Sequence, residues 1–295
     1  MHPYTIEHLS SREVLDHGKA KPARLAVIGY PVKHSASPRM HQPALDEAGV
    51  TARYIAVEVE PGRVSEAFSR MRDLGFIGCN ITVPHKFEAL KTCDQLDTAA
   101  EMLGAVNTVS FSPTSIKGTN TDGYGFEHAV AEALQTGIQD SSIFIAGAGG
   151  GAGGAIAAHC VMAGARRVVL ANRTLSKLDP LIARISGHGT EVIAVSLNDV
   201  TLPELASQCG LVVNTSSLGL RHEDSSPVPA ECFHSGQAVF DTIYQPPLTE
   251  FLRLAENAGA RIANGKGMLL HQGVKAFTTW FPESTPEAAM RRGLG

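Results

Sequence analysis

Short apolar segments alternate with helical sequence along the first 120 or so residues. The segments at residues 25–29, 53–59 and 75–83 each read as a strand. One helix is expected to begin near Ser37 and Pro38, with Ser37 as its N-cap, and another is expected near residues 64–71. This β-α-β-α-β order predicts a mainly parallel sheet with helices packed against it.

The alternation continues from about residue 123 and predicts a second domain. Its expected strands lie at residues 143–146, 167–171, 192–195, 211–214 and 238–241, and a last helix is expected over 268–277. Residues 1 to about 22 are polar without a clear period, so we expect an extension or a capping helix there. No repeat or low-complexity linker separates the halves, which favours two closely coupled domains of the α/β class.

Composition narrows the class of protein. The chain has 295 residues, of which 43% are hydrophobic and 18% charged, as is typical of a soluble globular protein. No apolar run is long enough to span a membrane and no signal peptide is evident, so a cytoplasmic location is expected. The formal net charge of −4 gives no electrostatic reason to expect nucleic acid. Five scattered cysteines and twelve histidines without ligand spacing predict reduced thiols and no metal.

Polar side chains at residues 80–86 give the first indication of a site. Asn80 and Thr82 are two residues apart, so on a strand they point to the same face. Pro84 has no N–H to donate and ends the pairing, and Lys86 follows at the expected start of a helix. Side chains just past the carboxyl end of a strand are placed to meet a ligand. The competing interpretation is an edge strand followed by a solvated lysine.

Residues 147–154 hold six glycines and predict a nucleotide site. They follow the strand expected at 143–146 and precede a helix expected over about 155–163. Glycines at such a turn let a pyrophosphate approach the backbone, and the helix N-terminus supplies N–H groups and positive partial charge. The competing interpretation is a flexible glycine loop.

The residues after the next strand indicate which dinucleotide is bound. An enzyme that prefers NAD usually places an acidic residue there to bind the ribose diol. This chain has Asn172, Arg173 and Thr174 instead, with Lys177 close by. Because Arg173 and Lys177 can pair with a 2′-phosphate, NADP is predicted rather than NAD. The alternative is a surface arginine and lysine without a ligand.

Further polar segments at residues 28–38, 104–108, 118–126 and 265–272 supply hydroxyls, amides, an acid and an amine, as a small polyol carboxylate would need. Each segment alone more often forms a turn or a cap. Together with the stretches 80–86, 147–154, 214–219 and 241–246, in this order, they resemble the shikimate dehydrogenase family. The resemblance covers about residues 25–283.

This resemblance implies an NADP-dependent oxidoreductase that reduces 3-dehydroshikimate to shikimate, on the pathway to chorismate and aromatic amino acids. The family fold implies a substrate domain of residues 1–122, to which 265–295 return, and a Rossmann-like NADP domain of residues 123–264. The catalytic cleft would lie between them. The partner is then a small-molecule substrate, and the chain is expected to be a monomer or a homodimer.

The resemblance also implies roles for individual residues. Lys86 and Asp122 correspond to the catalytic pair. The substrate-contacting positions are Ser35, Ser37, Asn80, Thr82, Asn107, Tyr244 and Gln272. The cofactor-binding positions are Gly147, Ala148, Gly149, Gly150, Gly151, Ala152, Asn172, Arg173, Thr174, Lys177, Thr215, Ser216, Gly265 and Met268.

The chemistry of a ketone reduction suggests what the pair does. Lys86 as an ammonium can polarise the carbonyl oxygen and support its protonation, and Asp122 can hold that ammonium or share its proton. Burial would lower the pKa of Lys86 and a nearby carboxylate would raise it. Lys86 as the proton donor and Lys86 as an electrostatic clamp therefore both stay open.

The chain departs from the family pattern in three places. The glycine loop is one residue longer, so its key glycines are either 147 and 149 or 149 and 151. The first register is favoured, because Gly147 directly follows the strand. Gln42 stands where the family usually has asparagine, and the first twenty or so residues have no counterpart. The alternatives are a quinate or shikimate dehydrogenase that uses NAD, and a non-catalytic nucleotide-binding regulator on the same fold.

Overall fold

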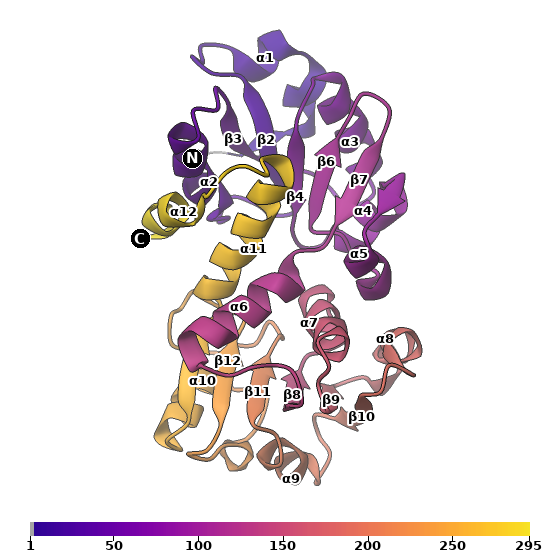
Figure 1. Ribbon diagram of the computed structural model, residues 1–295, viewed down its shortest axis with the longest axis vertical. Coiled ribbons are helices and arrows are strands. Elements are labelled where there is room, and N and C mark those ends of the chain that lie inside the picture. The colour runs from indigo at the N-terminus through magenta and orange to yellow at the C-terminus, as the bar shows by residue number, and fades with distance from the viewer. Residues whose placement is uncertain (1–2) are drawn as a thin grey trace. The chain divides into compact units, whose positions relative to one another are not determined.

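The computed structural model describes residues 3–295, which form two compact units. The first unit comprises the chain up to Thr121 together with Gln272–Gly295, and the second comprises Asp122–His271. The second unit thus continues past residue 264, the end that the resemblance implies. Figure 1 shows each unit as a sheet with helices packed on it.

The first unit is built on a seven-stranded sheet in the order β1-β3-β2-β4-β6-β7-β5. The strands are β1 (Tyr4–Thr5), β2 (Ala23–Gly29), β3 (Arg53–Glu58), β4 (Gly78–Ile81), β5 (Gln95–Leu96), β6 (Thr108–Phe111) and β7 (Ile116–Thr119). Strands β1 to β4 pair in parallel, while β6 pairs antiparallel with both β4 and β7. This antiparallel part, which the alternation of strands and helices did not predict, brings the start of β6 and the end of β4 together.

Helices cover this sheet and bury its apolar side chains. They are η1 (Ile6–Ser10), α1 (Arg12–Asp16), α2 (Ser37–Glu47), α3 (Val64–Asp73), α4 (Lys86–Thr92), α5 (Thr98–Leu103), the second part of α11 (Lys266–Trp280) and α12 (Glu287–Leu294). Phe68 and Met71 of α3 belong to one buried cluster with Ile28 of β2 and Val57 of β3. Burial of such side chains is the main contribution to folding of the unit.

The N-terminal segment, from residue 3 on, is part of the first unit rather than an appendage to it. β1 lies along β3 as an edge strand, with Tyr4 opposite Val57. Ile6, Leu9 and Leu15 are almost fully buried in the core. The segment expected to be an extension or a capping helix therefore completes both the sheet and the core.

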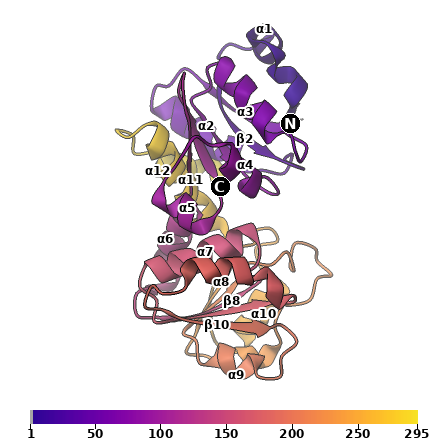
Figure 2. The same cartoon turned by 90° about the vertical axis from the view of Figure 1, so that its right-hand side faces the viewer.

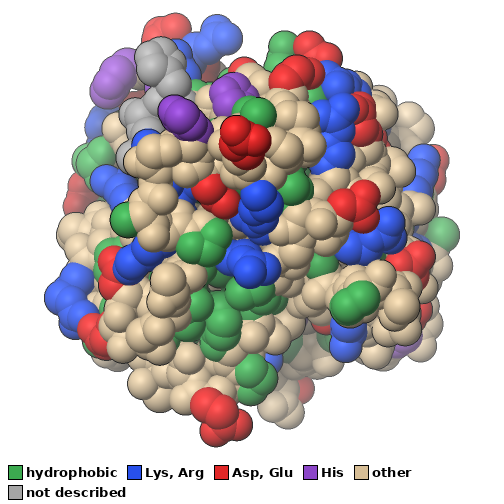
Figure 3. All heavy atoms as spheres, turned by 90° about the horizontal axis from the view of Figure 1, so that it is seen from above, with side chains coloured by type: hydrophobic (Ala, Val, Ile, Leu, Met, Phe, Trp, Pro, Cys, Tyr) green, Lys and Arg blue, Asp and Glu red, His purple; other side chains and the backbone are tan. Residues whose placement is uncertain are grey.

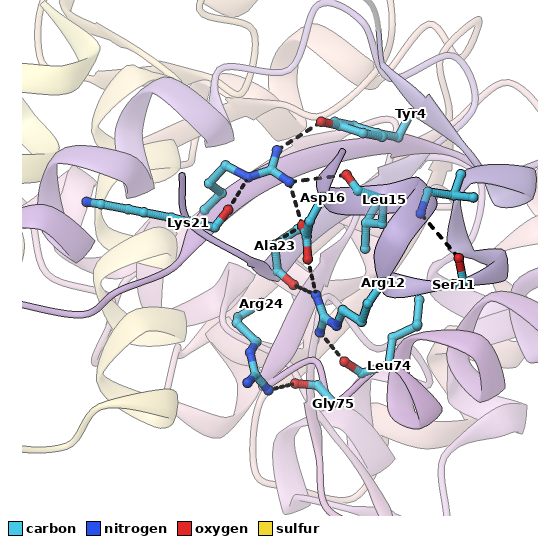
Figure 4. A network of polar contacts seen from close by, with 12 residues as sticks. Tyr4, Ser11, Arg12, Leu15, Asp16, Lys21, Ala23, Arg24, Leu74 and Gly75 are labelled. Atoms are coloured by element: carbon cyan, nitrogen blue, oxygen red, sulfur yellow. Dashed lines mark hydrogen bonds and ion pairs between the residues drawn. The ribbon is translucent and has the colours of Figure 1, made fainter. Parts of the chain in front are cut away.

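A network of polar contacts fixes this segment (Figure 4). Asp16 pairs with Arg53 at 2.7 Å and with Arg12 at 3.2 Å, and Arg12 also donates to the carbonyl oxygens of Ala23 and Leu74. Burial raises the pKa of Asp16, but the hydrogen bonds from the Ala23 N–H, Arg53 and Arg12 outweigh it and hold that pKa below its usual range.

The second unit is a six-stranded, fully parallel sheet in the order β10-β9-β8-β11-β12-β13. The strands are β8 (Ser142–Ala146), β9 (Arg167–Asn172), β10 (Glu191–Ser196), β11 (Leu211–Asn214), β12 (Ala238–Asp241) and β13 (Arg261–Asn264). The order reverses between β8 and β11. In open parallel sheets, ligands bind at the carboxyl ends of strands at such a switch point.

The helices of the second unit are α6 (Asp122–Leu134), α7 (Gly151–Met162), η2 (Leu175–Lys177), α8 (Asp179–Ile185), α9 (Leu202–Ser207), η3 (Ala230–Cys232), α10 (Glu250–Asn257) and the start of α11. Figure 2 shows α7 and α8 on one face of the sheet and α9 and α10 on the other. This two-sided cover explains why the strands are apolar throughout rather than alternating.

Two predicted helix starts shift in the structure. Helix α2 begins at Ser37 with Ala36 as its N-cap, so the expectation of Ser37 as the N-cap is wrong. Pro38 still lies in the first turn, where a missing N–H is not needed. Helix α7 begins at Gly151 instead of residue 155, so part of the glycine run forms its first turn.

The surface and the helices give two further observations. Among residues 3–295, no helix is long and apolar enough to cross a membrane. The face of the first unit seen in Figure 3 carries Lys and Arg side chains interspersed with Asp and Glu. That face therefore presents charges of both signs rather than one.

Candidate active site

Asn80 lies near the end of β4 and is held by three neighbours. The Tyr54 hydroxyl donates to Asn80 Oδ1 at 2.6 Å. Asn80 Nδ2 donates to Thr108 Oγ1 at 3.1 Å and to the carbonyl oxygen of Asn107 at 3.4 Å. All four residues are buried, so each of these polar groups needs the partner it has.

Asn107 continues the same network from the start of β6. Its Oδ1 accepts from the Thr121 N–H at 2.9 Å and from Thr108 Oγ1 at 3.0 Å. Its Nδ2 donates to Thr121 Oγ1 at 3.0 Å. The two predicted substrate amides, Asn80 and Asn107, are thus joined through Thr108.

Thr82 is the first residue after β4, and it is half-buried. Its N–H donates to the Ile28 carbonyl at 2.9 Å. A Cβ on Gly29 would lie 2.5 Å from Thr82 Cγ2, so glycine at the end of β2 is what lets the Thr82 side chain approach.

Lys86 is the first residue of α4 and is half-buried. The segment before it is anchored by His85, whose Nε2 lies 2.7 Å from the Val59 carbonyl. Glu88, in the first turn of the helix, accepts from the N–H groups of Gly62 and Val64, both at 3.0 Å. These contacts fix the start of the helix and so the backbone that carries Lys86.

Ser35 and Ser37 lie at the turn into α2. The Ser37 N–H donates to Ser35 Oγ at 3.3 Å, and Ser37 is buried. Ser35 also lines a cavity of about 700 Å³ on the first unit. Lys33 and Arg39 line the same cavity, so cationic side chains lie beside the predicted carboxylate position.

The remaining predicted substrate and catalytic residues are divided between the two units. Gln272 is half-buried on α11, where the chain returns to the first unit. Asp122, buried as the first residue of α6, and Tyr244, half-buried after β12, belong to the second unit.

The glycine loop after β8 is shaped by close approaches that a side chain would block. Gly147 has φ +82°, and a Cβ there would lie 2.7 Å from the Ser216 N–H nitrogen. A Cβ on Gly149 would collide with the Asn172 amide, and one on Gly153 would lie 2.5 Å from Thr215 Oγ1. Glycine is required at 147, 149 and 153, which favours the first register and places the extra residue between the second and third glycines.

This loop fits a dinucleotide pyrophosphate. Gly150, the N-cap of α7, has no atom within 3.4 Å of a notional Cβ, so the backbone is open there. Ala148, Gly151 and Ala152 complete the turn into the helix, whose N-terminus offers oriented N–H groups.

Thr215 and Ser216 follow β11, on the other side of the switch point. Thr215 donates to the Ala146 carbonyl through both its N–H and its hydroxyl, each at 2.8 Å. Ser216 donates to Asn214 Oδ1 at 2.9 Å through its N–H and at 2.7 Å through its hydroxyl. The ends of β8 and β11 are therefore tied together beside the glycine loop.

The predicted 2′-phosphate residues are open to solvent. Arg173, Thr174 and Lys177 are exposed after β9, whereas Asn172 is half-buried against the glycine loop. Among the described residues, no hydrogen bond or ion pair involves the Arg173 or Lys177 side chains. Both cations are thus available to an anionic ligand.

Gly265 and Met268 lie at the start of α11. A Cβ on Gly265 would collide with the Thr242 carbonyl, and the Gly265 N–H donates to the Ile243 carbonyl at 3.1 Å. Met268 is 8% exposed. Glycine at 265 thus keeps α11 close to the loop that carries Tyr244.

Sequence reasoning missed several polar residues of these sites. Tyr54, Thr108 and Thr121 join the predicted substrate amides, and Asp241 joins the loops that follow β11 and β12 of the second unit. Thr108 and Thr121 lie in segments that the sequence analysis singled out, so their proximity to Asn107 and Asp122 was an available signal. Tyr54 sits on a different strand, and nothing in the sequence pairs it with Asn80.

Asp241 is the buried acid of the second unit. Its Oδ1 accepts from the Ile243 N–H at 2.9 Å and from Asn214 Nδ2 at 3.1 Å, and its Oδ2 accepts from the Thr249 hydroxyl at 2.6 Å. Burial raises its pKa to about 6, although these three bonds act to lower it. Within residues 3–295, no three His, Cys, Asp or Glu side chains are grouped to hold a metal ion.

Comparisons with known proteins show to which family the chain belongs. The model of the shikimate dehydrogenase substrate binding domain matches residues 27–109. Shikimate dehydrogenase (NADP(+)) of Methanopyrus kandleri is 38% identical over 92% of this chain and 94% of its own length. The chain belongs to the shikimate dehydrogenase family.

Solved structures of this family have the same fold. Shikimate 5-dehydrogenase from Thermus thermophilus, in complex with NADP(H) and shikimate, is 35% identical with a TM-score of 0.80, over 92% of this chain and 99% of that one. Quinate dehydrogenase from Corynebacterium glutamicum, in complex with NAD, is 28% identical with a TM-score of 0.81, over 91% of this chain and 97% of that one. The fold is thus shared by proteins named for two related substrates.

Proposed function

We propose that this protein interconverts shikimate and 3-dehydroshikimate with NADP, as an oxidoreductase of the shikimate pathway. The observation that carries the proposal is the buried row Asn80–Thr108–Asn107, at the end of β4 and the start of β6. Two amides held rigidly at the end of one inner strand and the start of the next suit a ligand with several hydroxyls. Membership of the shikimate dehydrogenase family supports this choice of polyol carboxylate.

Lys86 and Asp122 are proposed to carry the proton transfer. An ammonium hydrogen-bonded to the ketone oxygen stabilises the negative charge that develops there during reduction. The anchoring of α4 by His85 and Glu88 supports the role of Lys86, because a charge-stabilising group acts best when its position is set beforehand. Asp122 is proposed to take part in the same proton transfer.

Ser35 and Ser37 are proposed to bind the substrate carboxylate, and Asn80, Thr82, Asn107, Tyr244 and Gln272 its hydroxyls and ring. Hydroxyl donors at the turn into α2, next to Lys33 and Arg39, suit an anion.

The cofactor residues are proposed to select NADP. The loop with Gly147, Gly149 and Gly153 would hold the pyrophosphate, and Arg173 and Lys177 the 2′-phosphate. When bound, the nicotinamide supplies or accepts the hydride. Thr215, Ser216, Gly265 and Met268 would line the nicotinamide and ribose end, where Asp241 fixes the loops on which they depend.

A spectrophotometric assay tests the proposal. Purified protein is mixed with each of shikimate and quinate and each of NADP and NAD, and absorbance at the wavelength of the reduced cofactor is followed. We expect the highest kcat/KM with shikimate and NADP. A preference for quinate or NAD would indicate the related dehydrogenase instead, and no reaction with any pair would contradict an enzymatic role.

A further inference from the structure

The hydrogen-bond directions around Asn80 are fixed by two backbone groups. The Asn107 carbonyl can only accept, so the Asn80 atom that faces it is the amide nitrogen. The Thr121 N–H can only donate, so the Asn107 atom that faces it is the side-chain oxygen. The orientations of both amides therefore follow from these two contacts.

Once these orientations are set, the roles of the two hydroxyls that contact Asn80 follow. Tyr54 must donate to Asn80 Oδ1, and Thr108 must accept from Asn80 Nδ2, which leaves the Thr108 hydrogen for Asn107 Oδ1 at 3.0 Å or Thr121 Oγ1 at 3.5 Å. Both hydrogens of the Asn80 amide are then used inside the protein, and one of its two oxygen lone pairs is occupied by Tyr54. Asn80 has one lone pair left for a ligand, and no hydrogen.

The ring of Tyr54 is itself held in place. The imidazole of His41 stacks on it with ring centroids 4.4 Å apart and an interplanar angle of 5°. Gln42 Oε1 accepts from the Tyr54 N–H at 2.9 Å. Tyr54 is 5% exposed, and burial raises its pKa well above the usual value, although a hydrogen bond with Ser37 acts to lower it, so the Tyr54 hydroxyl keeps its proton. Neighbouring residues of α2 thus fix both the ring and the backbone of Tyr54.

We propose that Tyr54 is a positioning residue that holds Asn80 in place as a hydrogen-bond acceptor, so that only a hydroxyl of the substrate, and not its ketone, can face Asn80. This inference rests on the proposed function, in which Asn80 contacts the substrate. A ketone oxygen has no hydrogen to donate, so facing Asn80 would leave two acceptors in contact in a buried place. The orientation with the ketone away from Asn80 is thereby favoured.

Tyr54→Phe tests this with little change of shape, because the ring and its stack on His41 are kept. We expect KM for shikimate to rise about tenfold, as for the loss of a buried hydrogen bond, with KM for NADP unchanged. Tyr4→Phe is the matched control, since the Tyr4 hydroxyl accepts from Arg53 at 2.9 Å on the same sheet but has no contact with Asn80. Shikimate kinetics equal to wild type in folded Tyr54→Phe would overturn the proposal.

Fluorinated substrates distinguish a positioning role of Tyr54 from a merely structural one. Fluorine cannot donate a hydrogen bond, so replacing the hydroxyl that faces Asn80 should weaken wild-type kcat/KM strongly. In Tyr54→Phe the Asn107 carbonyl still orients the Asn80 amide, but Oδ1 is no longer held by the Tyr54 hydroxyl, so its hydrogen bond with the substrate should be weaker and the same replacement should cost less. Analogues with fluorine at each non-reacting hydroxyl in turn identify the position. Equal losses in the two proteins at every position would contradict the inference.

A second variant covers the case in which Tyr54→Phe does not fold. Thr108→Val removes the hydroxyl on the other side of Asn80 and should produce the same rise in KM and the same reduced sensitivity to fluorine. Unchanged shikimate kinetics in this variant would count against the network. Wild-type protein is assayed alongside: no wild-type activity contradicts the proposed function, whereas an active wild type with unaffected variants contradicts the role of Tyr54 alone.

Discussion

The predicted substrate residues of the first unit and the predicted 2′-phosphate residues of the second unit are built in opposite ways. Asn80 and Asn107 are buried, and their side chains are bonded to Tyr54, Thr108 and Thr121 of the protein itself. Arg173 and Lys177 are exposed after β9.

This contrast in burial shows how the two groups of residues would discriminate between ligands, by hydrogen-bonding pattern in the first unit and by charge in the second. A rigid, satisfied network can reject a ligand of the wrong hydrogen-bonding pattern, because any mismatch leaves a buried group unpaired. Exposed cations recognise charge and tolerate change, because solvent screens them and their side chains are mobile. We therefore expect large effects from changes in the first unit and smaller ones at the cofactor phosphate.

The largest expected effect is at the reacting centre. Lys86→Ala should lower turnover by roughly 10²- to 10⁴-fold with a modest change in KM for shikimate, because an ammonium that acts in the transition state is lost. Steady-state kinetics measure this. Lys91→Ala, an exposed lysine on the same helix, is the control and should behave like wild type. Turnover of Lys86→Ala within a few-fold of wild type would exclude the proposed role.

The next largest expected effect is on the pH dependence of stability, and it concerns the buried imidazole of His41, which stacks on Tyr54. Both ring nitrogens of His41 are buried without a hydrogen-bond partner among the described residues, and burial lowers its pKa from 6.5 to about 3. Above pH 6.5 the imidazole is neutral in both states and its contribution to stability is complete. As pH falls from 6.5 toward 3, only the unfolded state binds a proton, so stability is lost by roughly 4 kcal/mol.

His41→Phe should remove this part of the acid destabilisation and keep an aromatic ring against Tyr54. Urea unfolding at a series of pH values measures it. His17→Phe, at an exposed position, should leave the loss of stability below pH 6.5 unchanged. If His41→Phe and wild type lose stability in parallel below pH 6.5, the buried imidazole is not the cause.

In the second unit, the stability should change with pH in the opposite direction and by a smaller amount. Burial raises the pKa of Asp241 from 3.8 to about 6. Below pH 3.8 the carboxyl is protonated in both states, and stability is lost as pH rises from 3.8 through 6, by about 2–3 kcal/mol. Asp241→Asn should therefore gain stability relative to wild type as pH rises through this window, provided that the Thr249 hydroxyl turns to accept from the new amide.

Asp224→Asn is the contrast for this measurement. Asp224 accepts from the N–H groups of Arg221 and Gly219, and these bonds lower its pKa. Its substitution should lose stability relative to wild type as pH rises. The same pH series of unfolding curves serves both variants, and parallel behaviour of Asp241→Asn and Asp224→Asn would refute the assignment.

The smallest expected effect is at the 2′-phosphate. Arg173→Ala should raise KM for NADP roughly tenfold and leave KM for NAD nearly unchanged, because one exposed charge-assisted contact is lost while Lys177 remains. Steady-state kinetics with the two cofactors provide the measurement. Arg253→Ala, on α10, should alter neither value. Equal increases for both cofactors would show that Arg173 does not recognise the phosphate.

Local sequence determined much of this protein. The apolar runs predicted the strands at 143–146, 211–214 and 238–241 closely, because buried parallel strands are apolar throughout. The glycine run after the first of these predicted the nucleotide loop, because only glycine permits such close backbone approaches. Its favoured register, with 147 and 149, agrees with the contacts of those glycines.

The tertiary structure decided what depends on contacts between distant segments. Residues 4–16 have no clear period, yet Ile6, Leu9 and Leu15 enter the core because β1 pairs with β3. The bond from Tyr54 to Asn80 joins neighbouring regions of one sheet across 26 positions of sequence. A sequence shows which side chains can donate or accept; the fold decides which partner each one meets, and so which way the amide of Asn80 must face.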